Sequence, residues 1–395
     1  MALLHSMRSS AARFLHLGEP DPRRRRPGTG SRKGGQMSMA GIGRRLAAVT
    51  VTVTAAVLTA AGTLTPALAA TGPSMTVNNG SVNIAVQGAD DSLLFYWAAN
   101  GSSAWFGEAV AGEDTTFAAP SMAVDGNSVN IAVEGPNNSL VLYSAVNGSS
   151  TWNAVQVAGT GTTFASPSIV TDGNDVDIAA RGPDDSLLFY WEVNGSNTWH
   201  QESVGGNLSD ASPPAMIVNG AAIDIAATGA FFALNFFWAY VGTGTWHQES
   251  VNATGEIWGP PSIAASGNRI DIAAINNTGA LMLYSAITGT GTWNAETVSG
   301  AADNYVAPSI TFQGSDVDIA RQGSSTSLLF YWAVSGSSTW HEESVGGADS
   351  AASPPSMTVN GNGVNISAVN TANQLLFYWA TIGTGTWHAE TVAEL

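Results

Sequence analysis

No cysteine occurs in the 395 residues, and basic residues are nearly absent after position 45. Without cysteine, the chain has no disulfide framework and no thiolate that could act as a nucleophile or bind zinc. Ten of the 13 lysine and arginine residues precede position 46, so residues 73–395 carry three arginines against 28 acidic residues, a formal charge of −25. Such a field repels nucleic acid and other polyanions, which leaves neutral ligands as the expected partners.

Charged residues of either sign are also few, at 11% of the chain, whereas 44 glycines are present. This composition suits many short strands joined by tight turns. What the sequence contains instead is a strict repeat, in which a proline opens each of seven units 47 residues apart. The opening prolines are Pro73, Pro120, Pro167, Pro214, Pro261, Pro308 and Pro355. A strand-rich period of this length indicates a toroidal or solenoidal array.

The segment before the repeats has the pattern of an export signal. Residues 46–64 are apolar with interspersed threonine, follow Arg44 and Arg45, and lead to Ala67-Leu68-Ala69. We therefore interpret residues 1–69 as an N-terminal extension and signal peptide cleaved near Ala69. A transmembrane anchor is the alternative, but no basic stop-transfer flank follows the run. The alanine-rich leader favours a secreted bacterial protein without membrane insertion after cleavage; the start codon and the choice between general and twin-arginine export stay open.

Residues 120–166 illustrate the strands expected in each unit. Apolar and polar residues alternate over 129–133, and apolar runs bounded by Gly, Asn, Asp and Ser predict further strands at 121–124, 140–146 and 151–157. Seven four-stranded antiparallel sheets with one longer crossover each describe an all-β, seven-bladed β-propeller over residues 70–395, with the first strand of each blade innermost. Each blade is then contiguous in sequence. A β-prism or stacked solenoid is the alternative, although parallel solenoids use shorter coils.

One tryptophan recurs at the head of the fourth strand in every unit. These residues are Trp105, Trp152, Trp199, Trp246, Trp293, Trp340 and Trp387. A side chain that every blade needs is expected to pack blades together.

A second pair of positions varies between units. Trp in the third strand accompanies His or Phe in the fourth, whereas Ser144 and Ser285 accompany Asn153 and Asn294. This covariation predicts a cross-strand pair. Glutamate follows two residues after each histidine, so Trp could stack on a pyranose while His and Glu bond its hydroxyls. The four predicted sites are Trp191, His200 and Glu202; Trp238, His247 and Glu249; Trp332, His341 and Glu343; and Trp379, His388 and Glu390, with a partial fifth at Trp97, Phe106 and Glu108. The alternative is that these pairs only pack.

A third column lies within the apolar second strand and holds either Asn or Asp. Its members are Asn83, Asn130, Asp177, Asp224, Asp271, Asp318 and Asn365. Exchange of Asp for Asn argues against acid–base chemistry and favours hydrogen bonding to neighbouring backbone. Acidic pairs occur at Asp90-Asp91 and Asp184-Asp185, but other units carry Asn-Asn, Phe-Phe or Ser-Thr there, so no metal site or other cofactor is expected.

Catalysis is not expected either. Propeller enzymes need a particular acid and base on loops lengthened in one or two blades, and every interval between the opening prolines here is 47 residues. Repetition of a weak site instead favours multivalent binding. A glycan-processing enzyme is the less favoured alternative.

The blade length, the Leu-Phe-Tyr-Trp runs and the Thr-Trp-His runs resemble the β-propeller lectins, which include fucose-specific and tachylectin-like groups and bacterial relatives. The resemblance implies a secreted lectin that binds glycans at its outer strands. Fucose-specific members share an Arg/Glu/aromatic site, of which only the aromatic and Glu parts, such as Trp191 and Glu202, have counterparts here. A structural or protein-interaction ring, such as a surface adhesin, is the alternative class. Which sugar is bound and whether rings associate stay open.

Overall fold

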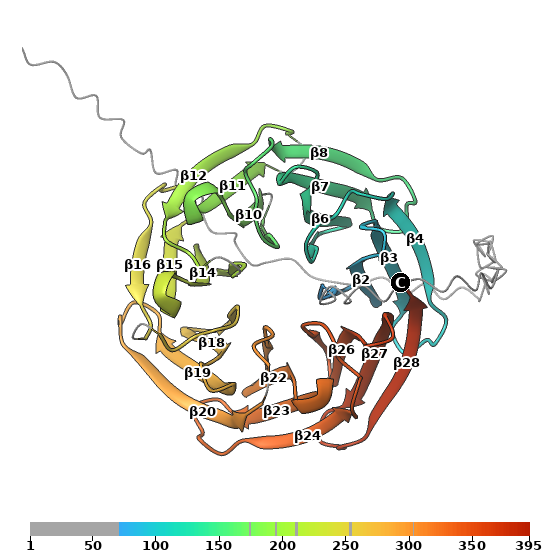
Figure 1. Ribbon diagram of the computed structural model, residues 1–395, viewed down its shortest axis with the longest axis vertical. Coiled ribbons are helices and arrows are strands. Elements are labelled where there is room, and N and C mark those ends of the chain that lie inside the picture. The colour runs from blue at the N-terminus through green and yellow to red at the C-terminus, as the bar shows by residue number, and fades with distance from the viewer. Residues whose placement is uncertain (1–70, 174, 194–195, 210–211, 253–254, 303) are drawn as a thin grey trace, which may run out of the picture. The chain divides into compact units, whose positions relative to one another are not determined.

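The structure, a computed structural model, describes residues 71–395 apart from residues 174, 194–195, 210–211, 253–254 and 303. The predicted export signal lies outside the described residues. The described residues form a closed ring of seven four-stranded antiparallel sheets, which confirms the predicted seven-bladed propeller (Figure 1). Within the described part of the chain, no helix is long and apolar enough to span a membrane.

The strands follow the repeat in chain order. Blade 1 contains β1 (Ser74–Asn78), β2 (Ser81–Gln87), β3 (Leu93–Ala99) and β4 (Phe106–Ala111). Blade 2 contains β5 (Ser121–Asp125), β6 (Ser128–Gly135), β7 (Ser139–Val146) and β8 (Asn153–Ala158). Blade 3 contains β9 (Ser168–Asp172), β10 (Asp175–Arg181), β11 (Leu187–Val193) and β12 (His200–Gly205). Blade 4 contains β13 (Ala215–Asn219), β14 (Ala222–Thr228), β15 (Leu234–Tyr240) and β16 (His247–Ser250).

Blade 5 contains β17 (Ser262–Ser266), β18 (Arg269–Ile275), β19 (Ala280–Ile287) and β20 (Trp293–Ala301). Blade 6 contains β21 (Ser309–Gln313), β22 (Asp316–Gln322), β23 (Leu328–Val334) and β24 (His341–Gly346). Blade 7 contains β25 (Ser356–Asn360), β26 (Gly363–Val369), β27 (Gln374–Thr381) and β28 (Trp387–Glu394). Three short 3-10 turns, η1 (Pro183–Asp185), η2 (Ala230–Phe232) and η3 (Ser324–Thr326), join second to third strands.

Each sheet has its strands in sequence order, and the first strands of consecutive blades contact one another around the centre of the ring. The first strand is therefore innermost and the fourth outermost, as predicted. The ring closes where β25 meets β1, and each blade uses contiguous sequence with no strand exchanged between the first and last blades.

The core lies between blades rather than within them. Second strands such as β10 are buried on both faces, because each sheet is covered by a neighbour on either side. Between blades 3 and 4, for example, Ala179 and Phe189 of one sheet pack in one cluster with Ile225 and Phe237 of the next. A single blade could not bury these residues, so the ring is the stable unit.

A ladder of serine hydroxyls links the inner strands. The backbone N–H of Met122 donates to Ser74 Oγ of the preceding blade at 3.0 Å. The same bond recurs from Ile169, Met216, Ile310 and Met357 to the preceding serine. Ring closure uses it too, since the N–H of Met75 donates to Ser356 Oγ at 3.0 Å. Blade 4 is the exception because Ala215 occupies the serine position.

Replacing Ser356 by Ala is expected to lower the free energy of unfolding by about 1–2 kcal/mol, because the buried Met75 N–H loses its acceptor. The reciprocal change, Ala215→Ser, is expected to raise it by up to about 1 kcal/mol by supplying an acceptor for Ile263. Urea denaturation followed by tryptophan fluorescence measures both. The exposed Ser266→Ala is the control. Equal midpoints for Ser356→Ala and the wild type would show that the ladder contributes nothing.

Candidate functional site

Four grooves lie between neighbouring blades, next to the turns that join third to fourth strands. Groove 3/4, between blades 3 and 4, is lined by Asp177, Trp191 and Glu202 of blade 3 and by Gly244 and Trp246 of blade 4. Equivalent residues line two further grooves: Asp224, Trp238, Glu249, Gly291 and Trp293 in groove 4/5, and Asp318, Trp332, Glu343, Gly385 and Trp387 in groove 6/7. Groove 7/1 is lined by Asn365, Trp379, Glu390 and Ser103, among others.

These four grooves coincide with the four complete Trp/His/Glu sets predicted from the sequence. Their cavity volumes are about 120 Å³ for groove 3/4, 50 Å³ for 4/5, 140 Å³ for 6/7 and 500 Å³ for 7/1. The assignment of these residues to ligand binding stays a prediction.

Strand register explains why the same residue types meet in each groove. Asp177 pairs with Trp191 and Trp191 with His200, so the three lie in one row across β10, β11 and β12. Glu202 lies one row further along the same face, opposite Phe189. The predicted cross-strand Trp–His pair is therefore confirmed. The pairing of β11 with β12 ends at this Trp191–His200 pair.

The histidines stack on the tryptophans from the outer strand. Ring centroids are 5.0 Å apart for Trp191–His200, 4.1 Å for Trp238–His247, 4.0 Å for Trp332–His341 and 5.2 Å for Trp379–His388. Phe106 replaces histidine in blade 1 and lies 5.7 Å from Trp97. The histidines are exposed and are not among the residues that line the grooves, whereas the half-buried tryptophans are. The structure thus brings Trp and Glu together in the groove and leaves His beside it.

Each glutamate of this set bonds the recurring tryptophan of the next blade. Trp246 Nε1 donates to Glu202 Oε2 at 3.0 Å, and the indole also meets Phe189 edge-on. The same bond joins Trp152 to Glu108, Trp293 to Glu249, Trp387 to Glu343 and, across the ring closure, Trp105 to Glu390. The expectation that these tryptophans pack blades together is confirmed. Sequence reasoning missed that the groove glutamates are their partners.

The turn of the following blade forms the other wall of the groove. Gly244 has a φ of +60°, and a Cβ there would lie 3.0 Å from Glu202 Oε1. The left-handed backbone therefore favours glycine, and a side chain here would displace the Glu202 carboxylate. Gly291 and Gly385 have the same backbone conformation in grooves 4/5 and 6/7.

The buried aspartates of the second strands line three of these grooves, a role that the sequence did not reveal. Burial, with smaller contributions from Asp175 and Asp172, raises the pKa of Asp177 to about 7. Burial likewise raises the pKa of Asp318 to about 7, with Asp316 and Glu343 adding to the effect. Burial raises the pKa of Asp224 to about 6, although the hydrogen bond that Asn219 Nδ2 donates to it at 2.8 Å lowers the pKa.

The expected hydrogen bonds from this column to backbone are replaced by bonds to side chains in blades 2, 4 and 5. Ser144 Oγ donates to Asn130 Oδ1 at 2.7 Å in blade 2. In blade 5, Arg269 donates from Nε to Asp271 at 2.8 Å and from Nη2 to Ser285 Oγ at 2.7 Å. The small serine thus admits a guanidinium where other blades have the indole. The backbone expectation was wrong in these blades because a polar side chain lies within reach: Ser144 directly across the row in blade 2, Asn219 of the preceding strand in blade 4, and Arg269 of the same strand in blade 5.

Within the described residues, no group of three His, Cys, Asp or Glu side chains could hold a metal ion. The groove chemistry is therefore that of an indole edge or face, a carboxylate and a buried Asp or Asn.

The chain is similar in structure to β-propeller lectins that bind fucose. It matches the BP39L lectin of Burkholderia pseudomallei with a TM-score of 0.73 at 18% identity, covering 82% of this chain and 99% of that one. It matches the SapL1 lectin, solved with α-methyl fucoside, with a TM-score of 0.54 at 12% identity, covering 70% and 96% of the two chains. The six-bladed Aleuria aurantia lectin, described with a fucose recognition mode, matches with a TM-score of 0.51 at 13% identity, covering 70% and 95%.

An enzyme shares the architecture as well. A prolyl endopeptidase matches with a TM-score of 0.54 at 12% identity, covering 81% of this chain but only 50% of the enzyme. No protein-family model and no curated protein matches the sequence. These likenesses establish the propeller fold.

The buried aspartates predict a pH dependence of stability. Their pKa lies above the unfolded value, so the folded protein holds more protons than the unfolded chain between about pH 4 and pH 7. Stability should therefore fall as pH rises through this window, by at most about 1.4 kcal/mol per pH unit for each group. Asp177→Asn combined with Asp318→Asn should flatten this dependence and raise the melting temperature at pH 8.

Thermal unfolding between pH 5 and pH 8.5 tests this expectation. Asparagine occupies the same position in blades 1, 2 and 7, so the substitution is compatible with the fold. Asp184→Asn, at an exposed turn, serves as the control. If the double variant and the wild type lost stability in parallel, the aspartates would not be the groups responsible.

Proposed function

We propose that the protein is a multivalent carbohydrate-binding protein, a lectin, with neutral-sugar sites in grooves 3/4, 4/5, 6/7 and 7/1. The observation that carries the proposal is the meeting of Trp191, Glu202 and Asp177 in one groove, repeated around the ring. An indole offers an apolar face to the C–H side of a pyranose. Carboxyl and amide groups beside it supply acceptors and donors for the ring hydroxyls.

Charge supports a neutral ligand. None of the residues that line the four grooves is Lys, Arg or His, and each lining includes at least one carboxylate. A sulfated or sialylated glycan would meet repulsion there, whereas a neutral sugar would not. Similarity in fold to lectins crystallised with fucosides adds support for a sugar ligand.

Repetition supports binding rather than catalysis. Several modest sites held on one rigid ring give avidity to a surface that presents many copies of a sugar. Trp97 and Glu108 form a fifth, partial set. The export signal predicted before residue 70 fits a secreted lectin that meets glycans outside the cell.

One feature favours a second candidate, a glycan-processing enzyme. Besides burial, Glu249 raises the pKa of Asp224 and Glu343 that of Asp318, so grooves 4/5 and 6/7 each hold two interacting carboxyl groups. Glycoside hydrolases use such a pair. The glutamates, however, are already bound to an indole of the next blade, and groove 7/1 has Asn365 in place of the acid. Both facts favour binding.

A glycan array with the purified protein tests the proposal. We expect binding to one coherent class of neutral glycans. Trp→Ser combined with His→Asn in blades 3, 4, 6 and 7 copies the pair found naturally in blades 2 and 5, and should abolish that binding while the fold survives. In a single groove, loss of the indole should weaken the intrinsic affinity by about tenfold, or 1.4 kcal/mol.

Isothermal titration with the sugar identified on the array measures the affinity and the number of sites. Gln201→Ala is the matched control and should leave binding unchanged, because Gln201 lies on the face of β12 opposite to His200 and Glu202. A silent array with folded protein would overturn the lectin proposal and favour a protein partner. Turnover of nitrophenyl glycosides would favour the enzyme.

A further inference from the structure

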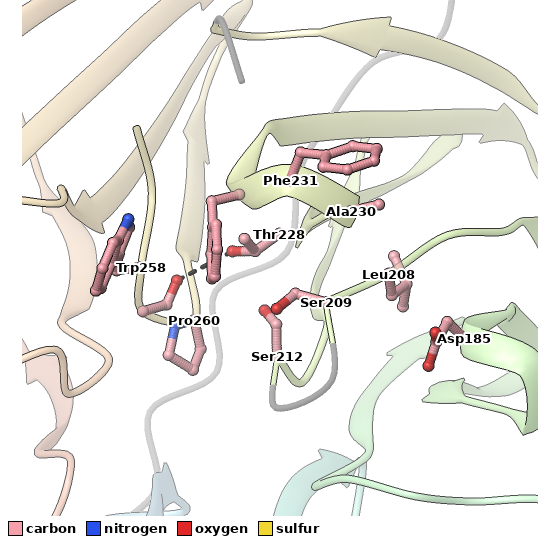
Figure 2. A pocket seen from close by; sticks show the side chains of 11 residues that line it. Asp185, Leu208, Ser209, Ser212, Thr228, Ala230, Phe231, Trp258 and Pro260 are labelled. Carbon is pink, nitrogen blue, oxygen red and sulfur yellow. Dashed lines mark hydrogen bonds between the residues drawn. The ribbon is translucent and has the colours of Figure 1, made fainter. Parts of the chain in front are cut away.

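Another cavity, of about 420 Å³, lies away from the four grooves. Its walls come from η2 in blade 4, from the η1 turn of blade 3 and from the loops that lead into β13 and β17 (Figure 2). The grooves lie beside turns that join third to fourth strands. In an antiparallel blade, turns that join second to third strands lie at the opposite end, so this cavity opens on the other face of the ring.

Blade 4 departs from the repeat at this cavity. Phe231 and Phe232 have φ values of 58° and 60°, in the left-handed region that bulky side chains avoid. The equivalent residues in blades 2 and 3, Asn137-Asn138 and Asp184-Asp185, suit that conformation, and blade 6 has the small polar pair Ser325-Thr326 there. Phe231 is also 80% exposed. Two strained aromatic residues facing water do not serve the fold, which indicates a function at this turn.

The aromatic residues form a continuous platform. Phe232 stacks on Trp258 with centroids 5.3 Å apart, and Trp258 lies 5.4 Å from Tyr305 of the next crossover. Trp258 is 48% exposed and Tyr305 41%. An exposed row of rings of this kind offers stacking surface to a ligand.

Polar groups line the same cavity. Ser212 is only 4% exposed, and its Oγ has no hydrogen-bond partner. Ser209 lies beside it, since the Ser212 N–H donates to the Ser209 carbonyl oxygen. Asp185 adds a carboxylate whose Oδ1 accepts from Arg181. An apolar occupant would leave the Ser212 hydroxyl unpaired, and no cationic side chain lines the cavity to bind an anion.

We propose that this cavity is a second kind of ligand site, which binds one neutral, hydroxylated pyranose ring stacked on Phe232 and Trp258, with the exposed Phe231 beside them, and bonded by Ser212 and Asp185. The site is built from residues that the grooves do not share. With grooves on one face and this site on the other, the protein can bridge two glycan-bearing surfaces.

Fluorine NMR of the protein labelled with 5-fluorotryptophan tests the site. Trp258→Phe assigns the Trp258 resonance, and methyl glycosides of the common neutral hexoses and of N-acetylglucosamine are the probes. At least one probe should shift the Trp258 resonance saturably. Phe231→Asn with Phe232→Asn, which restores the asparagine pair of blade 2, should abolish that shift without lowering the melting temperature. Ser212→Ala should weaken the same binding at least fivefold.

The groove resonances distinguish this site from the proposed grooves. Trp191, assigned by Trp191→Ser, should respond to groove ligands equally in the wild type and in the Phe231/Phe232 variant. If no probe moves the Trp258 resonance, the second site is overturned, whether or not the Trp191 resonance responds. A Trp258 shift that survived the double asparagine variant would also overturn it.

Discussion

The hydrogen bond that five of the seven recurring indoles donate to the glutamate of the preceding blade is the interaction on which the ring and its grooves both depend. It fixes the outer end of the blade interface, where the apolar cluster gives way to solvent, and it closes the ring between Trp105 and Glu390. The same carboxylate forms a groove wall. Blade 2 shows the converse, since Val155 replaces the glutamate, the Trp199 indole nitrogen has no partner, and Ser144 replaces the groove tryptophan. Blade 2 therefore lacks both the glutamate and the groove tryptophan, whereas blade 5 keeps Glu296 and has Ser285 in place of the tryptophan.

Much of this fold could be predicted from the sequence because seven copies of one unit serve as their own alignment. The 47-residue spacing of the prolines predicted the blades, and the covariation of Trp with His predicted the register between the third and fourth strands. Contacts between blades were harder to predict. Glu202 and Trp246 are 44 residues apart and recur in most units, so they do not covary in a way that identifies partners. The groove aspartates were missed for a related reason: within an apolar strand they resemble residues that bond backbone.

The four grooves are not equivalent, and the difference is local. Grooves 3/4, 4/5 and 6/7 combine a buried Asp with a left-handed glycine two residues before the interface tryptophan. Groove 7/1 has Asn365 and Ser103 at these positions and is several times larger. An acid that is partly protonated near neutral pH can donate as well as accept, whereas an amide does both at any pH. Ligand preference and its pH dependence should therefore be alike in grooves 3/4, 4/5 and 6/7 and should differ in groove 7/1.

Departures from the repeat show where requirements other than folding act. Arg269 departs from the repeat in blade 5, but Ser285 of the same blade leaves room for its side chain and accepts a hydrogen bond from it. The Phe231-Phe232 turn has no such compensation: it keeps the backbone conformation that Asn, Asp, Ser and Thr adopt in other blades, yet uses residues poorly suited to it. A strained turn that carries the largely exposed Phe231 side chain points to selection for the surface it creates. That surface faces away from the grooves, so the two kinds of proposed site lie on opposite faces of the ring and differ in design.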